Sequence, residues 1–164
     1  MPKILGITLI IFLSLVQLSF AEKKIAFIDI DMIINESEFG KKSYQAIDNE
    51  FEKENQKLLK IEKNLVSKEQ KILNQKNILS KEELNNKVTD LKKEINDFQK
   101  KKRLINEKFN KMRLDKTNEM VQSLNVILSK YADENNISMI IQKKFIVIAK
   151  SGLDITNEIL KIFN

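Results

Sequence analysis

Apolar residues recur at alternating spacings of three and four along the middle of the chain. The first series is Tyr44, Ile47, Phe51, Leu58, Ile61, Leu65, Ile72 and Leu79. The second series is Leu84, Val88, Leu91, Ile95, Phe98, Ile105, Phe109 and Met112. This spacing places one narrow apolar stripe along each of two helices, as in a coiled coil. Because no glycine or proline lies between Gly40 and Gly152, the pattern predicts two long helical rods.

The two series are separated by a helix start signal. Ser80 and Glu83 have the Ser-x-x-Glu spacing of a capping box. We therefore place a turn near residues 76–81 and predict that residues 41–131 form an antiparallel helical hairpin. At 1.5 Å per residue, its two helices would span about 58 Å and about 80 Å.

The stripe of the first helix loses its apolar character towards this turn. One of its two heptad positions is apolar throughout, whereas the other becomes polar at Lys68 and Gln75. In the second helix, Lys102 is the main polar interruption of the stripe. We expect the hairpin to pack more weakly near the turn than near its other end.

Short apolar runs flank the hairpin. Lys24 to Ile30, Met139 to Ile141 and Phe145 to Ala149 are rich in β-branched residues and predict three short strands. Residues 22–40 and 132–164 would together form a small β-containing body. The fold class is therefore mainly α with a small β body, in which a coiled-coil hairpin projects from a short-stranded base. Such a base buries little apolar surface, so we expect it to oligomerise.

Two short helices complete this body. The segment from Met32 to Phe39 predicts a helix of one or two turns, which Asp31 could cap. Gly40 would then allow a change of direction before the first rod. A final helix follows the Ser151-Gly152 turn, with Asp154 or Thr156 as its cap.

The first residues have the features of an export signal. Lys3 precedes the apolar run from Ile4 to Val16, and Ser19-Phe20-Ala21 supplies small residues before a cleavage site between Ala21 and Glu22. Residues 1–21 would then be removed. An uncleaved membrane anchor is the alternative, but the run is shorter than the roughly 20 residues that span a bilayer.

The composition argues against an enzyme. The chain has no cysteine and no histidine, so the common nucleophile–base pairs and transition-metal ligand sets cannot be assembled. With three glycines in all, it has no glycine-rich phosphate loop. Asp29 and Asp31 form an acidic pair, but such pairs are more often turn or capping groups than catalytic ones. We expect no cofactor and no metal.

Positive charge is concentrated in the middle of the chain. The formal net charge is +6, and residues 60–103 carry 13 basic and 7 acidic residues. This segment is either a functional basic surface or the solvated face of a lysine-rich rod, and the sequence leaves both interpretations open. The candidate residues for a diffuse contact with clients or lipids are Lys60, Lys63, Lys71, Lys76, Lys81, Lys87, Lys92, Lys93, Lys100, Lys101, Lys102 and Arg103.

The order of these features resembles a known family. Lys24-Ile-Ala-Phe-Ile-Asp, Asn35-Glu-Ser-Glu-Phe-Gly-Lys-Lys, the hairpin and the closing Leu153-Asp-Ile-Thr-Asn-Glu-Ile-Leu are similar to the Skp (OmpH-like) periplasmic chaperones. The resemblance covers essentially the whole chain after the signal. It implies a homotrimer whose terminal strands form a shared β-body, with three hairpins around a cavity that holds unfolded outer-membrane β-barrel proteins. The residues that would build the body and its trimer contacts are Ile25, Phe27, Ile28, Met139, Ile140, Ile141, Ile146, Val147 and Ile148.

A chaperone of this kind in the periplasm would hold its clients by many weak contacts, without ATP. The basic side chains would attract acidic clients or anionic lipid headgroups. A secreted coiled-coil adaptor of the cell envelope is the alternative function, and it would suppress no aggregation. A nucleic-acid binder would also use a basic rod, but the export signal argues against it, and we expect no nucleic-acid partner.

Overall fold

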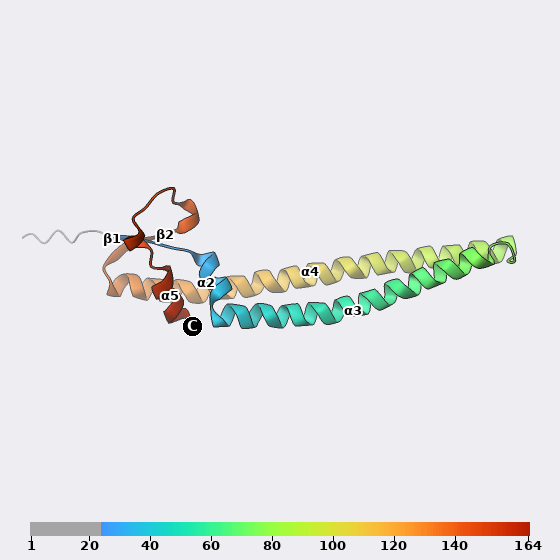
Figure 1. Ribbon diagram of the computed structural model, residues 1–164, viewed down its shortest axis with the longest axis horizontal. Coiled ribbons are helices and arrows are strands. Elements are labelled where there is room, and N and C mark those ends of the chain that lie inside the picture. Colours follow the sequence, from blue (N-terminus) through green and yellow to red (C-terminus); the bar gives the residue numbers. More distant parts are fainter. Residues whose placement is uncertain (1–23) are drawn as a thin grey trace, which may run out of the picture.

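The structure, a computed structural model, describes residues 24–164 (Figure 1). The signal segment and its cleavage site at Ala21 and Glu22 lie outside these residues. The elements in chain order are strand β1 (Lys24–Ile28), helices α2 (Ile30–Glu36), α3 (Glu38–Gln75) and α4 (Lys81–Glu134), strand β2 (Ile137–Gln142), 3-10 turns η1 (Lys143–Phe145) and η2 (Ser151–Leu153), and helix α5 (Thr156–Phe163). The predicted mainly helical fold, with a long hairpin and a small sheet, is confirmed.

Helices α3 and α4 lie side by side and form a rod that projects from a small base (Figure 1). Helix α3 has 38 residues and α4 has 54, so the last part of α4 extends past the start of α3 into the base. The turn between them is stabilised by the predicted capping box. The Ser80 hydroxyl accepts a hydrogen bond from the Glu83 backbone N–H, and the Glu83 carboxylate accepts one from the Ser80 backbone N–H. Asn135, with Asn136 at a positive φ of 54°, ends α4 before β2.

The sheet of the base has two parallel strands that the whole hairpin connects. Ile25 pairs with Met139, and Phe27 pairs with Ile141. Because side chains alternate along a strand, the sheet has two distinct faces. One of them packs on the end of α4 and on α5. The buried residues of this core are Ala26, Ile28, Ile33, Leu124, Ile155 and Ile159.

The predicted third strand, Phe145 to Ala149, is absent from the described residues. Lys143–Phe145 forms a 3-10 turn, and residues 146–150 form no regular structure. The connection from β2 to α5 loops away from the base instead (Figure 1). Its β-branched composition suits a strand, but a strand forms only where it pairs with another strand, and in this structure the segment pairs with none.

Two further details near the start of the hairpin differ from the sequence analysis. Asp29, not Asp31, caps α2, because its carboxylate accepts a hydrogen bond of 2.9 Å from the Met32 backbone N–H. The chain changes direction at Ser37, which caps α3, and Gly40 lies inside that helix. At the other end of the chain, α5 has no side-chain cap bond of its own, although the Asp154 carboxylate accepts a hydrogen bond of 3.0 Å from the Thr156 backbone N–H.

Gly40 is required because α2 and α3 approach each other closely there. A Cβ atom at this position would lie 1.7 Å from the backbone oxygen of Ile34. We expect Gly40→Ala to destabilise the base by about 2 kcal/mol or more, since the backbone must move to admit the methyl group. A thermal unfolding experiment measures this. Gly152→Ala is the matched control, because no atom lies within 4 Å of its Cβ position, and an equal loss in both variants would contradict the explanation.

Candidate functional site

The hairpin is held firmly in the half that lies nearer the base. Its buried residues are Ile47, Leu58, Leu65, Phe98, Ile105 and Phe109. The rings of Phe51 and Phe109 meet edge to face with centroids 5.2 Å apart. Ion pairs flank this seam: Lys108 lies 2.7 Å from Glu50, and Arg113 pairs with Asp48. These contacts stabilise one fixed register between α3 and α4.

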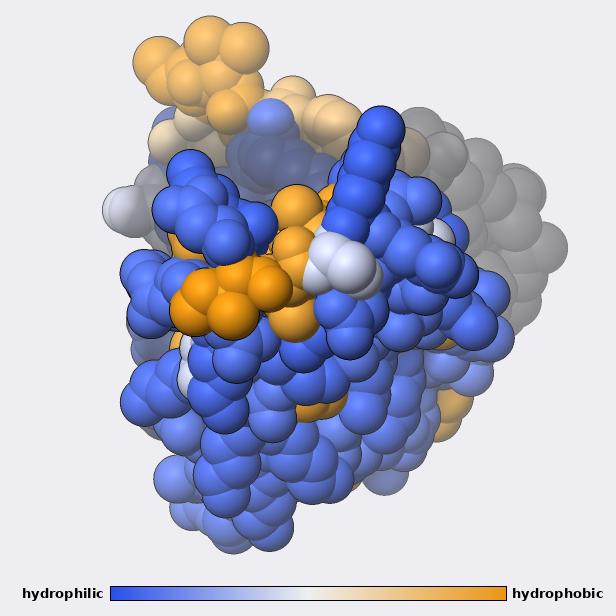
Figure 2. All heavy atoms as spheres, turned by 90° about the vertical axis from the view of Figure 1, so that its right-hand side faces the viewer, coloured by the Kyte–Doolittle hydropathy of each residue, from blue (hydrophilic) through white to orange (hydrophobic). Residues whose placement is uncertain are grey.

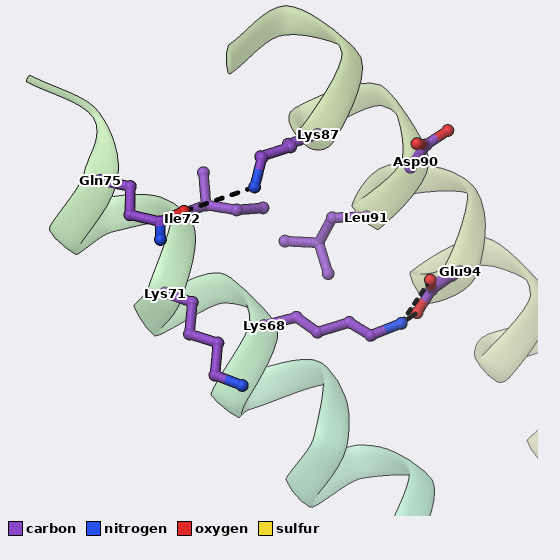
Figure 3. Close-up of a pocket in the computed structure, with 8 residues that line it drawn as sticks. All are labelled: Lys68, Lys71, Ile72, Gln75, Lys87, Asp90, Leu91 and Glu94. Carbon is purple, nitrogen blue, oxygen red and sulfur yellow. Dashed lines mark hydrogen bonds and ion pairs between the residues drawn. The ribbon is translucent and has the colours of Figure 1, made fainter. Parts of the chain in front are cut away.

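The half nearer the tip is packed more loosely. No residue of the hairpin between 66 and 97 is buried. Ile72 and Leu91 point towards each other there, but they border a cavity of about 300 Å³ whose other lining residues are polar or charged (Figure 3). Lys68, at a seam position of α3, reaches across to Glu94 at 2.6 Å. The polar seam positions therefore replace apolar packing by exposed ionic and hydrogen-bonded contacts, which contribute little to stability.

Ten of the twelve basic residues that the sequence predicts as contacts fall into two groups. The first, which we call the belt, comprises residues 57–63 of α3 and 97–103 of α4. The cross-hairpin pairs Glu50–Lys108 and Lys68–Glu94 bracket these two segments and show that they lie opposite each other. The belt contains seven basic and two acidic residues, and Lys60, Lys63 and Lys100 to Arg103 are all exposed. At 1.5 Å per residue, it lies about 24 Å from the turn.

The second group, which we call the tip, comprises residues 71–87 around the turn. It contains four exposed lysines, Lys71, Lys76, Lys81 and Lys87, and two acidic residues, Glu82 and Glu83. Lys92 and Lys93 follow between the two groups.

Hydrogen bonds from the Ser80 hydroxyl and backbone N–H lower the pKa of the Glu83 carboxyl, so this residue stays charged while it caps α4. In the sequence, belt and tip form one continuous basic segment, and only the pairing of α3 with α4 shows which lysines of the two helices lie opposite each other.

One apolar residue at the tip was missed by the sequence analysis. Ile78 lies in the turn, and its side chain is 84% exposed. A view along the rod from this end shows apolar atoms within a mainly hydrophilic surface (Figure 2). The signal in the sequence was an isoleucine inside the polar turn Lys76-Asn77-Ile78-Leu79-Ser80, outside either stripe.

The apolar residues predicted for the base lie on two different faces. Ile28 is fully buried in the core between the sheet and the helices, and Ile140 packs against that core. Ile25 and Met139 form a pair on the opposite face and are 48% and 55% exposed, next to the buried Phe27 and the partly buried Ile141. In the connection to α5, Ile146 is partly buried, whereas Val147 and Ile148 are almost fully exposed, as is much of Phe145. The outer face of the sheet therefore exposes Ile25 and Met139, and the connection exposes Phe145, Val147 and Ile148.

A polar network ties the two ends of the chain together in the base. The Thr156 hydroxyl donates to the Asp154 carboxylate and accepts a hydrogen bond of 2.9 Å from the Asp29 backbone N–H. Burial alone would raise the pKa of the Asp154 carboxyl. The hydrogen bonds from Thr156 and from Lys143 outweigh burial and lower that pKa. The network serves the fold, since each of its members is occupied by a structural contact.

Within residues 24–164, no group of three or more acidic side chains could hold a metal ion. In the same part of the chain, no helix is long and apolar enough to cross a membrane. The two residues of the predicted acidic pair differ in their surroundings. Asp29 caps α2, whereas Asp31 is exposed. The candidate site is thus an extended surface of base, belt and tip.

Comparison with known proteins agrees with this architecture. The family model of the outer membrane protein (OmpH-like) family matches residues 24–163, nearly all of the chain that the structure describes. The chain belongs to this family. It is the Skp family of chaperones for outer membrane proteins, as the resemblance in the sequence implied.

A solved structure shows the same fold. A crystal structure from Caulobacter crescentus CB15, described as a candidate outer membrane chaperone (OmpH-like), matches with a TM-score of 0.76 at 15% sequence identity. The match covers 87% of this chain and 85% of that chain. No curated protein gave a significant match. At this identity, the likeness shows a shared fold.

The difference in packing along the hairpin leads to a prediction about its stability. We expect Phe109→Ala to destabilise the protein by about 3 kcal/mol or more, since it removes a buried ring from the seam. Ile72→Ala, in the loosely packed half, should cost about 1 kcal/mol. Hydrogen exchange should also show faster amide exchange in residues 66–97 than around Phe109 in the unsubstituted protein. Equal exchange along the whole hairpin would contradict the proposed difference.

Proposed function

We propose that this protein is an ATP-independent periplasmic holdase that binds unfolded outer-membrane β-barrel proteins between the hairpins of a homotrimer. The observation that carries the proposal is the hairpin itself. It makes up most of the described chain, and the chain belongs to the OmpH-like chaperone family. Such a rod can act on a client only through its surface.

The base supports assembly into a trimer. The two-stranded sheet is too small to be stable alone, and its outer face presents Ile25 and Met139 to solvent. Strand β2 pairs with β1 alone among the described residues, so its other edge is open to another strand. The exposed segment 145–149 of a second copy has the composition to cover this face. A contact between two different surfaces of identical chains forms a closed ring where its rotation closes, and a rotation of one third of a turn would give the proposed trimer.

The hairpin supports client binding in two ways. The loosely packed half near the tip can bend at low cost, so that hairpins adjust to clients of different size. The belt carries a local net charge of +5 and attracts acidic segments of an unfolded chain from a distance. Each contact is weak, and several hairpins acting together retain the client without an energy source for release.

A substitution on the outer face of the sheet tests whether the protein forms a trimer. We expect Met139→Glu to lower the molecular mass in light scattering from that of three chains to that of one, because the charge would be buried between copies. The protomer should keep its helical circular dichroism, since Met139 is outside the core cluster of the base. Leu114→Glu is the matched control: it changes an apolar side chain of α4 that is 60% exposed, and the mass should not change. A single-chain mass for the unsubstituted protein would rule out the trimer.

Substitutions of belt lysines test whether this surface captures clients. The substitutions Lys60→Glu, Lys63→Glu and Lys100→Glu together should slow the capture of an acidic, urea-unfolded outer-membrane β-barrel protein by about tenfold at low salt. The measurement is suppression of light scattering after dilution of the client, without nucleotide or metal. The same three changes at Lys41, Lys53 and Lys111 alter the net charge equally but leave the belt intact, and they should have a much smaller effect. Loss of the difference between the two variants at high salt is also expected.

Two results would contradict this proposal. If the two variants behave identically at low salt, the belt does not steer clients. If the unsubstituted protein suppresses no aggregation at all, the holdase function is wrong, and a coiled-coil adaptor of the cell envelope would explain the rod better.

A further inference from the structure

We propose that Asn136 is an acceptor for N-linked glycosylation, so that the exported protein carries one oligosaccharide on its base. Asn136, Ile137 and Ser138 form the sequence Asn-x-Ser, in which the middle residue is not proline. Transferases that attach an oligosaccharide to an asparagine side chain recognise this motif. The inference rests on the export that is expected from residues 1–21, and it is independent of the holdase function and of the trimer.

The chain contains this motif twice, and the fold closes one of the two copies. The first copy is Asn35-Glu36-Ser37. Asn35 lies inside helix α2, and Ser37 is fully buried, with its hydroxyl accepting a hydrogen bond of 3.0 Å from the Gly40 backbone N–H. A transferase must reach both the asparagine amide and the hydroxyl two residues later. This copy is therefore closed in the folded protein.

The second copy lies where helix α4 gives way to strand β2, at the end of the molecule opposite the tip (Figure 1). Asn136 and Ser138 are both exposed. The φ angle of Asn136 is 54°, a left-handed conformation that asparagine adopts more readily than most residues and that turns the chain sharply. Within residues 24–164 its side-chain amide makes no hydrogen bond, whereas that of Asn135 donates one of 2.9 Å to the Tyr131 carbonyl oxygen. The Asn136 amide is thus open to an incoming enzyme.

Ser138 is accessible because strand β2 bulges at this residue. Lys24 pairs with Ile137 and Ile25 pairs with Met139, so Ser138 has no partner residue on β1. The extra residue of a bulge stays outside the regular ladder and bends the strand locally. The motif can therefore enter an active site while the pairs from Ile25 onwards remain in place.

An acidic residue precedes the second copy at a position that matters for the bacterial enzymes. Bacterial oligosaccharyltransferases select Asp or Glu two residues before the asparagine, and Glu134 occupies this position. Its side chain is 61% exposed, and its contact with Lys130 spans 3.8 Å, so an exposed and weak ion pair is all that holds it. In the first copy the same position is Ile33, which is fully buried. The charge pattern thus favours the same copy as the exposure does.

The reaction requires a polyprenyl-diphosphate-linked oligosaccharide as its second substrate. The Asn136 Nδ2 atom forms a bond to C1 of the first sugar, and the bond from C1 to the diphosphate oxygen breaks. The amide loses one proton, and polyprenyl diphosphate leaves. No electron is transferred, and this chain supplies the acceptor side chain alone.

A glycan at this position would lie far from the surfaces of the hairpin. Helix α4 has 54 residues, so the connection to β2 is about 80 Å from the turn at 1.5 Å per residue. The oligosaccharide would cover part of the base with a hydrated chain and leave belt and tip unobstructed.

The first experiment uses the folded mature chain, residues 22–164, a purified bacterial oligosaccharyltransferase and an undecaprenyl-diphosphate-linked oligosaccharide. The intact mass should increase by one oligosaccharide, and digestion with trypsin should place it on the peptide from Tyr131 to Lys143. Asn136→Gln and Ser138→Ala should each abolish the increase. Asn135→Gln is the matched control and should keep it, with unchanged circular dichroism in all three variants. A glycan on Asn35, or no increase in the unsubstituted chain, would overturn the inference.

The acidic position is tested in the same reaction. Glu134→Gln should lower the modified fraction by about tenfold, because the enzyme loses a charged contact with its acceptor. Asp133→Asn makes the same change of charge one residue earlier, at an exposed position, and should have little effect. Equal loss in both variants would contradict the role of Glu134.

The modification is then sought in the protein isolated from the envelope of the cells that produce it. The peptide from Tyr131 to Lys143 should carry the glycan, and an unmodified peptide alone would overturn the inference even if the purified chain is an acceptor. The holdase assay separates this result from the proposed function. Asn136→Gln should suppress client aggregation as well as the parent does, and a glycosylated protein without holdase activity would refute the proposed function alone.

Discussion

The structure depends on a single seam between two helices. The buried residues of this seam, from Ile47 to Leu65 on α3 and from Phe98 to Phe109 on α4, are the main apolar contact that holds the hairpin together. Two helices can bury only a narrow stripe of each other, so the rest of their surface remains in solvent. Where the stripe becomes polar, at Lys68 and Gln75, no other core replaces it. The rod is consequently firm near the base and loosely packed near the tip.

This arrangement separates three surfaces along one axis. The base presents apolar residues on the outer face of a sheet, the belt presents an excess of positive charge, and the tip combines one exposed isoleucine with lysines. A compact domain of the same length would bury more of its apolar residues and bring its charged groups closer together. A long rod keeps such surfaces tens of ångströms apart, so that each can meet a different partner. The assembly and the client binding that we propose then need not compete for the same residues.

The sheet explains why a chain with so small a base forms this fold at all. Parallel strands need a long crossover connection, and here the connection is the entire hairpin. The strands bring the two ends of the chain together over the end of α4, where Leu124, Ile28 and Ile159 are fully buried. Thr156 and Asp154 add a polar network on the same side. The start of α3 is fixed by this contact as well, since Gly40 lies against the carbonyl oxygen of Ile34.

Features that depend on local order along the chain could be predicted from the sequence. Heptad spacing, the absence of glycine and proline, and the Ser80–Glu83 capping box were enough to predict both helices and the break between them, because each of these acts within a few residues. The order of the elements was also enough to indicate the family. The contacts between residues far apart in the chain became visible in the folded molecule. The fold left Phe145–Ala149 without a strand partner, placed Ile25 and Met139 on the open face and Ile28 in the core, and separated the belt from the tip. Burial, strand pairing and the opposition of charges depend on segments far apart in the chain, and no local pattern specifies how those segments are aligned.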